Sequence, residues 1–124
     1  MKKLHPLFYV LLCMALNSCR FHDSNIDITY SNSDHYYSMK ARFSKNKTRD
    51  VEAYIDRRIG KKSNMSFART EIDGTISLDD ETKFYMQKSP GVLEIKLDKD
   101  ENSEEAYYAI KSLCEGIKPI VTNQ

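Results

Sequence analysis

The chain has 124 residues, with 19 Lys and Arg against 18 Asp and Glu, so its formal net charge at pH 7 is +1. A chain of this length forms one small domain with a single modest core. The near balance of charge disfavours a nucleic-acid partner, because nucleic-acid-binding domains are usually strongly basic.

The first eighteen residues have the layout of a secretory signal peptide. A basic start at Lys2 and Lys3 is followed by an apolar run from Leu7 to Leu16. This run is about half as long as the roughly twenty apolar residues that a membrane-spanning helix needs. We therefore predict that residues 1–18 are a signal peptide rather than a membrane anchor.

The residues around the expected cleavage point, Leu16-Asn17-Ser18-Cys19, resemble the lipobox of bacterial lipoproteins, with Asn17 as a mild departure from the motif. The resemblance implies cleavage before Cys19 and a bilayer anchor of two or three acyl chains on that residue, palmitate among them. It also implies delivery to the outer membrane, on the periplasmic side or at the cell surface, because Arg20 rather than Asp follows the cysteine. The alternative is an ordinary secreted protein in which Cys19 carries no lipid.

Residues 19–34 are rich in Ser, Asn and Asp, and we predict that they form a flexible tether behind the lipidated cysteine. The alternation from Ile26 to Tyr30 leaves a short edge strand open as an alternative.

The predicted domain spans residues 35–119, and its first half contains a strand and a helix. Apolar residues alternate from Tyr37 to Phe43, which is typical of a half-buried strand. The residues from Val51 to Ile59 follow helical spacing, and Gly60 stands where a helix C-cap is expected. We then expect two short strands, residues 65–72 and 75–78, around a turn at Asp73-Gly74.

The second half of the predicted domain contains a hairpin and a helix. Strands at residues 82–88 and 92–98 meet in one register that places Met86 opposite Ile95 and Tyr85 opposite Lys96. Asn102 and Glu105 resemble a capping box before the last helix. Gly116 and Pro119 mark the predicted end of that helix, and residues 120–124 are predicted to be a frayed tail.

The predicted order is strand, helix, four strands, helix. Because the strands alternate instead of running continuously apolar, we expect an antiparallel sheet with one covered face. The fold class is α+β, a two-layer sandwich with about four or five strands and two helices on one face of the sheet. A ferredoxin-like split arrangement is disfavoured, since no helix is visible between the middle strands.

The uncovered face of this sheet is the candidate binding face, because its charged groups flank an aromatic side chain that could anchor a protein partner. The alternative is a plain solvated face. The expected members are Ser38, Lys40, Arg42, Arg69, Lys83, Tyr85, Gln87, Glu94 and Lys96.

No residue pattern predicts a catalytic site, a metal site or a cofactor. The acidic turn Asp79-Asp80-Glu81 lacks the spacing of a calcium-binding loop, and His22 and His35 are too few for structural zinc. Cys114 lies on the apolar side of the last predicted helix, so we expect a small buried thiol, with a reactive thiol or an intermolecular disulfide as the alternatives. The chain is therefore predicted not to be an enzyme.

The expected function is that of a binding or structural subunit at the outer membrane, such as an accessory part of an envelope or secretion assembly. From Phe84-Tyr85 to the helix start Ser103-Glu104-Glu105-Ala106, the chain is similar in kind to small Bacteroidetes-type lipoproteins. The alternative is an immunity or inhibitor lipoprotein that blocks a toxin or hydrolase, with its acidic turns in a basic cleft.

Overall fold

The structure is a computed structural model, and it describes residues 26–123. The strands are β1 (Asp27–Asn32), β2 (Tyr36–Arg42), β3 (Ile72–Ser77), β4 (Lys83–Ser89) and β5 (Val92–Asp98). The helices are α2 (Thr48–Ile55), α3 (Lys61–Ser63), α4 (Glu104–Glu115) and α5 (Ile117–Thr122), and a π-type turn at Asp56–Gly60 joins α2 to α3. The predicted signal peptide and Cys19 lie outside the described residues.

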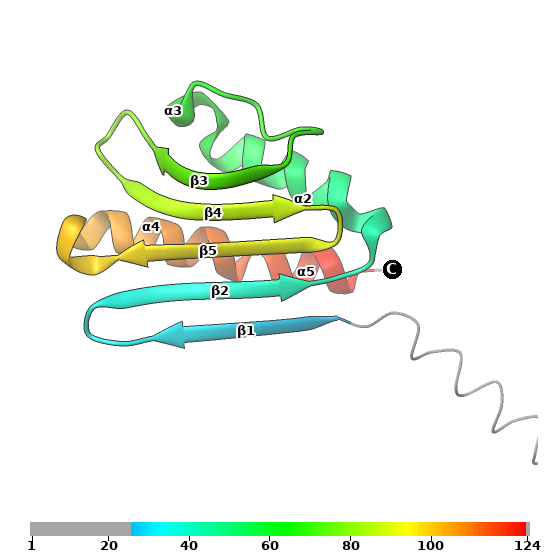
Figure 1. Cartoon of the computed structure of the whole chain (residues 1–124), viewed down its shortest axis with the longest axis horizontal. Coiled ribbons are helices and arrows are strands. Elements are labelled where there is room, and N and C mark those ends of the chain that lie inside the picture. Colours follow the sequence, from blue (N-terminus) through cyan, green and yellow to red (C-terminus); the bar gives the residue numbers. More distant parts are fainter. Residues whose placement is uncertain (1–25, 124) are drawn as a thin grey trace, which may run out of the picture.

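The five strands form one antiparallel sheet in the order β1-β2-β5-β4-β3. The described helices all lie on one side of this sheet, and nothing within residues 26–123 covers the other side (Figure 1). The predicted class, a two-layer α+β sandwich with an antiparallel sheet, is confirmed. The predicted element order is wrong in two places, because one strand precedes β2 and a single strand, β3, replaces the pair expected at residues 65–78.

The β4–β5 hairpin forms in the predicted register. Met86 lies opposite Ile95, Tyr85 opposite Lys96, and Ser89 opposite Val92 at the turn. Gly91 in this turn has a φ of 77°, a left-handed conformation that glycine adopts without the steric cost of a Cβ atom. Local turn chemistry and the apolar face of both strands therefore agree on one pairing.

The predicted tether is wrong after residue 26, because Asp27–Asn32 forms β1 at the edge of the sheet. Ile28 lies opposite Ala41 and packs against the core. This apolar contact stabilises the pairing of the otherwise polar strand with β2. At the far end of β1, the Asn32 amide donates to the Tyr107 hydroxyl at 2.8 Å and so joins the strand to α4. The domain thus begins at Asp27 and not at residue 35.

The first helix passes its predicted end. Gly60 has ordinary right-handed helical angles, and the chain turns only at Asn64, whose φ of 58° is left-handed. Residues 64–71 then form a loop instead of a strand, and Phe67 within it is completely buried. The expected turn at Asp73-Gly74 is wrong as well, because both residues lie inside β3.

The last helix begins with a different cap from the predicted one. Ser103 is the N-cap, and its hydroxyl accepts from the Ala106 amide at 3.0 Å. Asn102 bonds instead to the backbone of Lys83 and Asp98, which ties the ends of β4 and β5 together. The predicted frayed tail is also wrong at its start, because residues 120–122 belong to α5 and Val121 is buried.

The core lies between the sheet and the helices. Inward side chains of the three central strands, among them Met39, Met86 and Ile95, have no exposed surface. Cys114 is equally buried, as predicted, and burial raises the pKa of its thiol to about 12. The buried Tyr37 hydroxyl makes no well-formed hydrogen bond, and burial together with the Cys114 thiol raises its pKa. Both groups are therefore neutral in the folded protein at ordinary pH.

The Cys114 thiol should make stability depend on alkaline pH. Its folded pKa is raised from 9.0, so its contribution is complete below pH 9 and is lost as the pH rises towards about 12. The reason is that the unfolded thiol ionises first. We expect a loss of about 1 kcal/mol between about pH 8 and about pH 10, measured by urea unfolding. In Cys114→Ala the free energy of unfolding should fall less steeply between these pH values than in the wild-type protein. An equally steep fall would contradict this explanation.

Candidate functional site

The uncovered face of the sheet carries two rows of polar side chains that cross all five strands. The register aligns Thr29, Lys40, Glu94, Gln87 and Asp73 in one row. The second row consists of Ser31, Ser38, Lys96, Tyr85 and Thr75. Directly opposed side chains on one face of a sheet are neighbours, so the opposite charges of Lys40 and Glu94 lie beside each other across β2 and β5.

Lys96 and Tyr85 of the second row lie beside a second tyrosine, Tyr36 at the start of β2. The Lys96 ammonium lies over the Tyr36 ring, 4.5 Å from its centroid, and Lys96 is the cross-strand neighbour of Tyr85. The Tyr85 hydroxyl donates to Asp73 at 2.6 Å, and this hydrogen bond raises the pKa of Tyr85. Tyr36 is 44% exposed. We call Tyr36, Tyr85 and Lys96 the aromatic cluster.

Most of the predicted binding residues lie where they were expected. Ser38 and Lys40 on β2, Lys83, Tyr85 and Gln87 on β4, and Glu94 and Lys96 on β5 share the uncovered face, and Arg42 ends β2 beside them. Tyr36 belongs to the same face but was not predicted. Its alternation with buried Tyr37 was the signal that could have identified it.

Arg69 is the exception, and its predicted place on this face is wrong. It lies in the loop before β3 with a φ of 57°, and its backbone amide donates to the Glu52 carboxylate at 3.2 Å. Glu52 belongs to α2, so this contact draws the loop towards the helical side of the molecule.

Glu52 also forms a buried ion pair with Lys88, and nothing in the sequence pattern predicted it. The Lys88 ammonium lies 2.5 Å from its carboxylate, and the side chains are 3% and 6% exposed. Lys88 pairs with Leu93, which places it on the inward face of β4. One turn after Glu52, Asp56 accepts from the Phe67 amide at 2.8 Å. The two carboxylates of one helix therefore fix the loop that precedes β3.

The uncovered face contains two shallow hollows. One of about 380 Å³ is lined by residues that include Thr29, Lys40, Arg42 and Glu94. The other, of about 260 Å³, lies at the aromatic cluster and also contacts Lys83. Such hollows with mixed charge can receive individual side chains of a protein partner.

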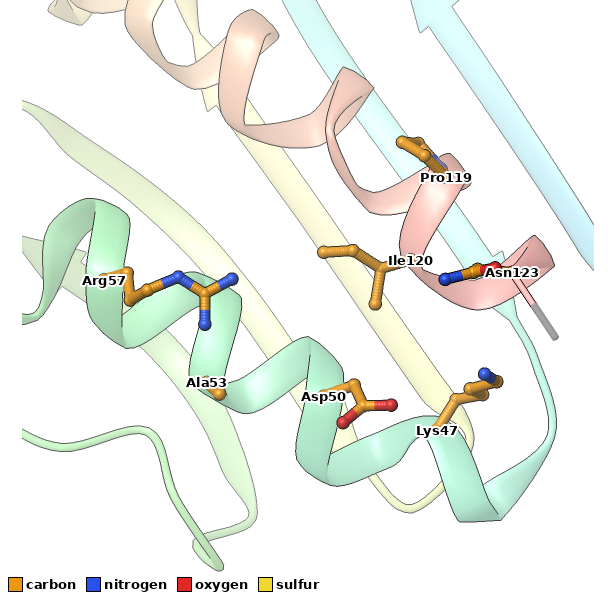
Figure 2. Close-up of a pocket in the computed structure, with 7 residues that line it drawn as sticks. All are labelled: Lys47, Asp50, Ala53, Arg57, Pro119, Ile120 and Asn123. Carbon is orange, nitrogen blue, oxygen red and sulfur yellow. The ribbon is translucent and has the colours of Figure 1, made fainter.

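Another hollow, of about 420 Å³, lies on the opposite side, between α2 and α5 (Figure 2). Lys47, Asp50 and Arg57 line one wall, and Ile120 and Asn123 line the other. This hollow combines cations, one carboxylate and an amide, but its lining contains no Ser, Cys or His nucleophile. It therefore offers polar contacts and not a recognisable catalytic arrangement.

Of the residues considered for metal binding or thiol chemistry, Cys114 lies in the core and His22 lies outside the described residues. Within residues 26–123, no three His, Cys, Asp or Glu side chains are placed so that they could hold a metal ion. His35 forms a surface pair with Asp100 at 2.9 Å. In the same part of the chain, no helix is both long and apolar enough to cross a bilayer.

Comparisons of the chain with protein-family models, with curated proteins and with solved structures find no match.

Removing only one member of the buried ion pair between Glu52 and Lys88 should destabilise the fold more than replacing both. Lys88→Met leaves the Glu52 carboxylate buried beside an apolar side chain, and we expect the free energy of unfolding to fall by about 3–5 kcal/mol. The double variant Glu52→Gln and Lys88→Met keeps an acceptor for the Arg69 amide without a buried charge, so it should recover most of that loss.

Urea unfolding checks this, with Lys96→Met as the control for an exposed lysine on the same sheet, expected to change stability by less than about 0.5 kcal/mol. If the double variant were as unstable as Lys88→Met, the explanation through an unpaired charge would fail.

Proposed function

We propose that the protein is a lipid-anchored outer-membrane lipoprotein that acts through contact with a protein partner. In this proposal residues 1–18 are removed and Cys19 is acylated, which agrees with the lipobox-like residues Leu16, Ser18 and Cys19. The domain serves as a binding or structural subunit, such as an accessory part of an envelope or secretion assembly.

The observation that carries the binding role is the uncovered sheet face with its aromatic cluster. In residues 26–123 the helices cover only one side of the sheet (Figure 1), so the polar and charged side chains on its other side remain open. Tyrosines beside a charged group are typical of the residues that dominate binding energy at protein interfaces. The two hollows beside them supply places for side chains of the partner.

The anchor is tested by palmitate labelling of the full chain in a Gram-negative host. We expect label on the wild-type protein and its loss from Cys19→Ser, because the acyl chains attach through that residue. The wild-type protein should also float with membranes. Label that persists on Cys19→Ser would refute lipid attachment at this position.

The binding face is tested by affinity capture from detergent-solubilised membranes. We expect the wild-type protein to retain a stoichiometric partner, and the double variant Tyr36→Ala and Tyr85→Ala to lose it. Two anchoring tyrosines correspond to a loss of affinity of about thirtyfold or more.

The matched control is Tyr108→Ala, because Tyr108 is 55% exposed on α4, on the other side of the molecule. Circular dichroism verifies that all variants are folded. Equal capture by the double variant and the control would contradict a binding role for this face.

An immunity or inhibitor lipoprotein is the second candidate, and the gathering of acidic loops at one end of the sheet favours it. The turn between β1 and β2, the loop between β3 and β4, and the link from β5 to α4 lie at the same end (Figure 1). They carry Asp34, Asp79, Asp80, Glu81, Asp100 and Glu101. Such an end complements a basic cleft. A toxin gene directly upstream would support this candidate, and a cluster of envelope-apparatus genes would support the first.

A further inference from the structure

The point where the chain enters the domain determines which end of the domain lies near the proposed anchor. β1 begins at Asp27, and its register partner is Arg42 at the end of β2. Seven residues, 20–26, separate Cys19 from Asp27. Whatever conformation they take, eight peptide steps span at most about 28 Å. If Cys19 is acylated, as proposed above, the Asp27 end of the sheet lies close to the bilayer.

The same end of the domain carries a run of cations. Between residues 42 and 49 the chain has Arg42, Lys45, Lys47 and Arg49, with no acidic residue among them. Arg42, Lys45 and Arg49 are exposed, and Lys47 is half-buried. This run forms the end of β2, the connection to α2 and the first turn of α2 (Figure 1). We call residues 42–49 the basic run.

The opposite end of the sheet is acidic. In addition to the loop residues named above, Glu104 and Glu105 begin α4 there, and both are exposed. Hydrogen bonds from Thr82 lower the pKa of Asp80, which keeps that carboxylate ionised. The domain therefore has a cationic end beside its entry point and an anionic end away from it.

We infer that the basic run docks on the anionic lipid headgroups of the membrane and that the acidic end points away from it. Lys and Arg side chains gain attraction only within about a Debye length of the lipid surface, about 8 Å at physiological salt. The short connection allows the basic run to come within that range, and repulsion of the acidic loops by the anionic lipids opposes the reverse orientation. In this orientation the strands run from the bilayer outwards, with their cationic end at the lipid surface. The uncovered face of the sheet remains accessible to a partner.

Depth-dependent fluorescence quenching tests this orientation. The full chain, processed in a Gram-negative host, is labelled through an azido-bearing residue at position 46 or position 77. Asn46 and Ser77 are uncharged and exposed, and they lie at the cationic and the acidic end respectively. The protein is reconstituted in phosphatidylcholine vesicles with or without about 30% phosphatidylglycerol, together with a lipid that carries a quencher on its headgroup.

With phosphatidylglycerol, the label at position 46 should be quenched about threefold more than the label at position 77. This difference should shrink in neutral vesicles and in the double variant Lys45→Glu and Lys47→Glu. It should also shrink in about 1 M NaCl, because the Debye length there is only about 3 Å. The matched control is Lys83→Glu and Lys96→Glu on the uncovered face, which should keep the difference. Equal quenching at both positions, or a difference that ignores lipid charge and salt, would overturn the inference.

Flotation of the vesicles separates this inference from the proposed anchor. Protein that does not float with the vesicles would refute the anchor. The same quenching comparison is then made on the chain from Cys19 onward, coupled through the Cys19 thiol to a maleimide-bearing lipid, since Cys114 is buried and protected. Stronger quenching at position 46 than at position 77 on anionic vesicles would support docking of the basic run in this lipid-coupled protein as well. Equal quenching at the two positions would refute the docking.

Discussion

The structure depends on burial of only one face of the sheet. Inward side chains such as Met39, Met86, Ile95 and Leu97 are completely covered by the helices. The core of so small a domain is barely sufficient for stability, and little apolar surface remains for a second layer. The other face must therefore be polar, and it offers the area on which a contact function can be built.

Charge is distributed over this scaffold in two different ways. The uncovered face carries charges of both signs, as at the cross-strand neighbours Lys40 and Glu94, so that face favours specific contacts over bulk attraction. Along the strands, by contrast, the charge separates into a cationic and an anionic end. The first pattern is the basis of the proposed protein contact, and the second is the basis of the inferred docking on anionic lipids.

Local patterns predicted the parts of the fold that short-range physics controls. The β4–β5 hairpin follows from alternation and from its turn, and the burial of Tyr37, Tyr54 and Cys114 follows from strand and helix periodicity. The candidate face was predicted for the same reason, because outward residues of a strand are known once its inward residues are known. Arg69 was misplaced because its strand was a loop, held by the Glu52 and Asp56 carboxylates from seventeen and eleven residues away in sequence.

The sequence by itself determined an α+β sandwich with one covered face, since the period of the apolar residues sets which side of each element is buried. Tertiary structure decided between a tether and the alternative edge strand at Asp27–Asn32, because a polar edge strand is stabilised by pairing with β2 and by contact with α4. It also decided that Lys88 is buried, because an inward lysine is tolerated only where Glu52 compensates its charge. Both outcomes depend on contacts between residues far apart in the chain, and a local sequence pattern does not indicate which distant residues come into contact.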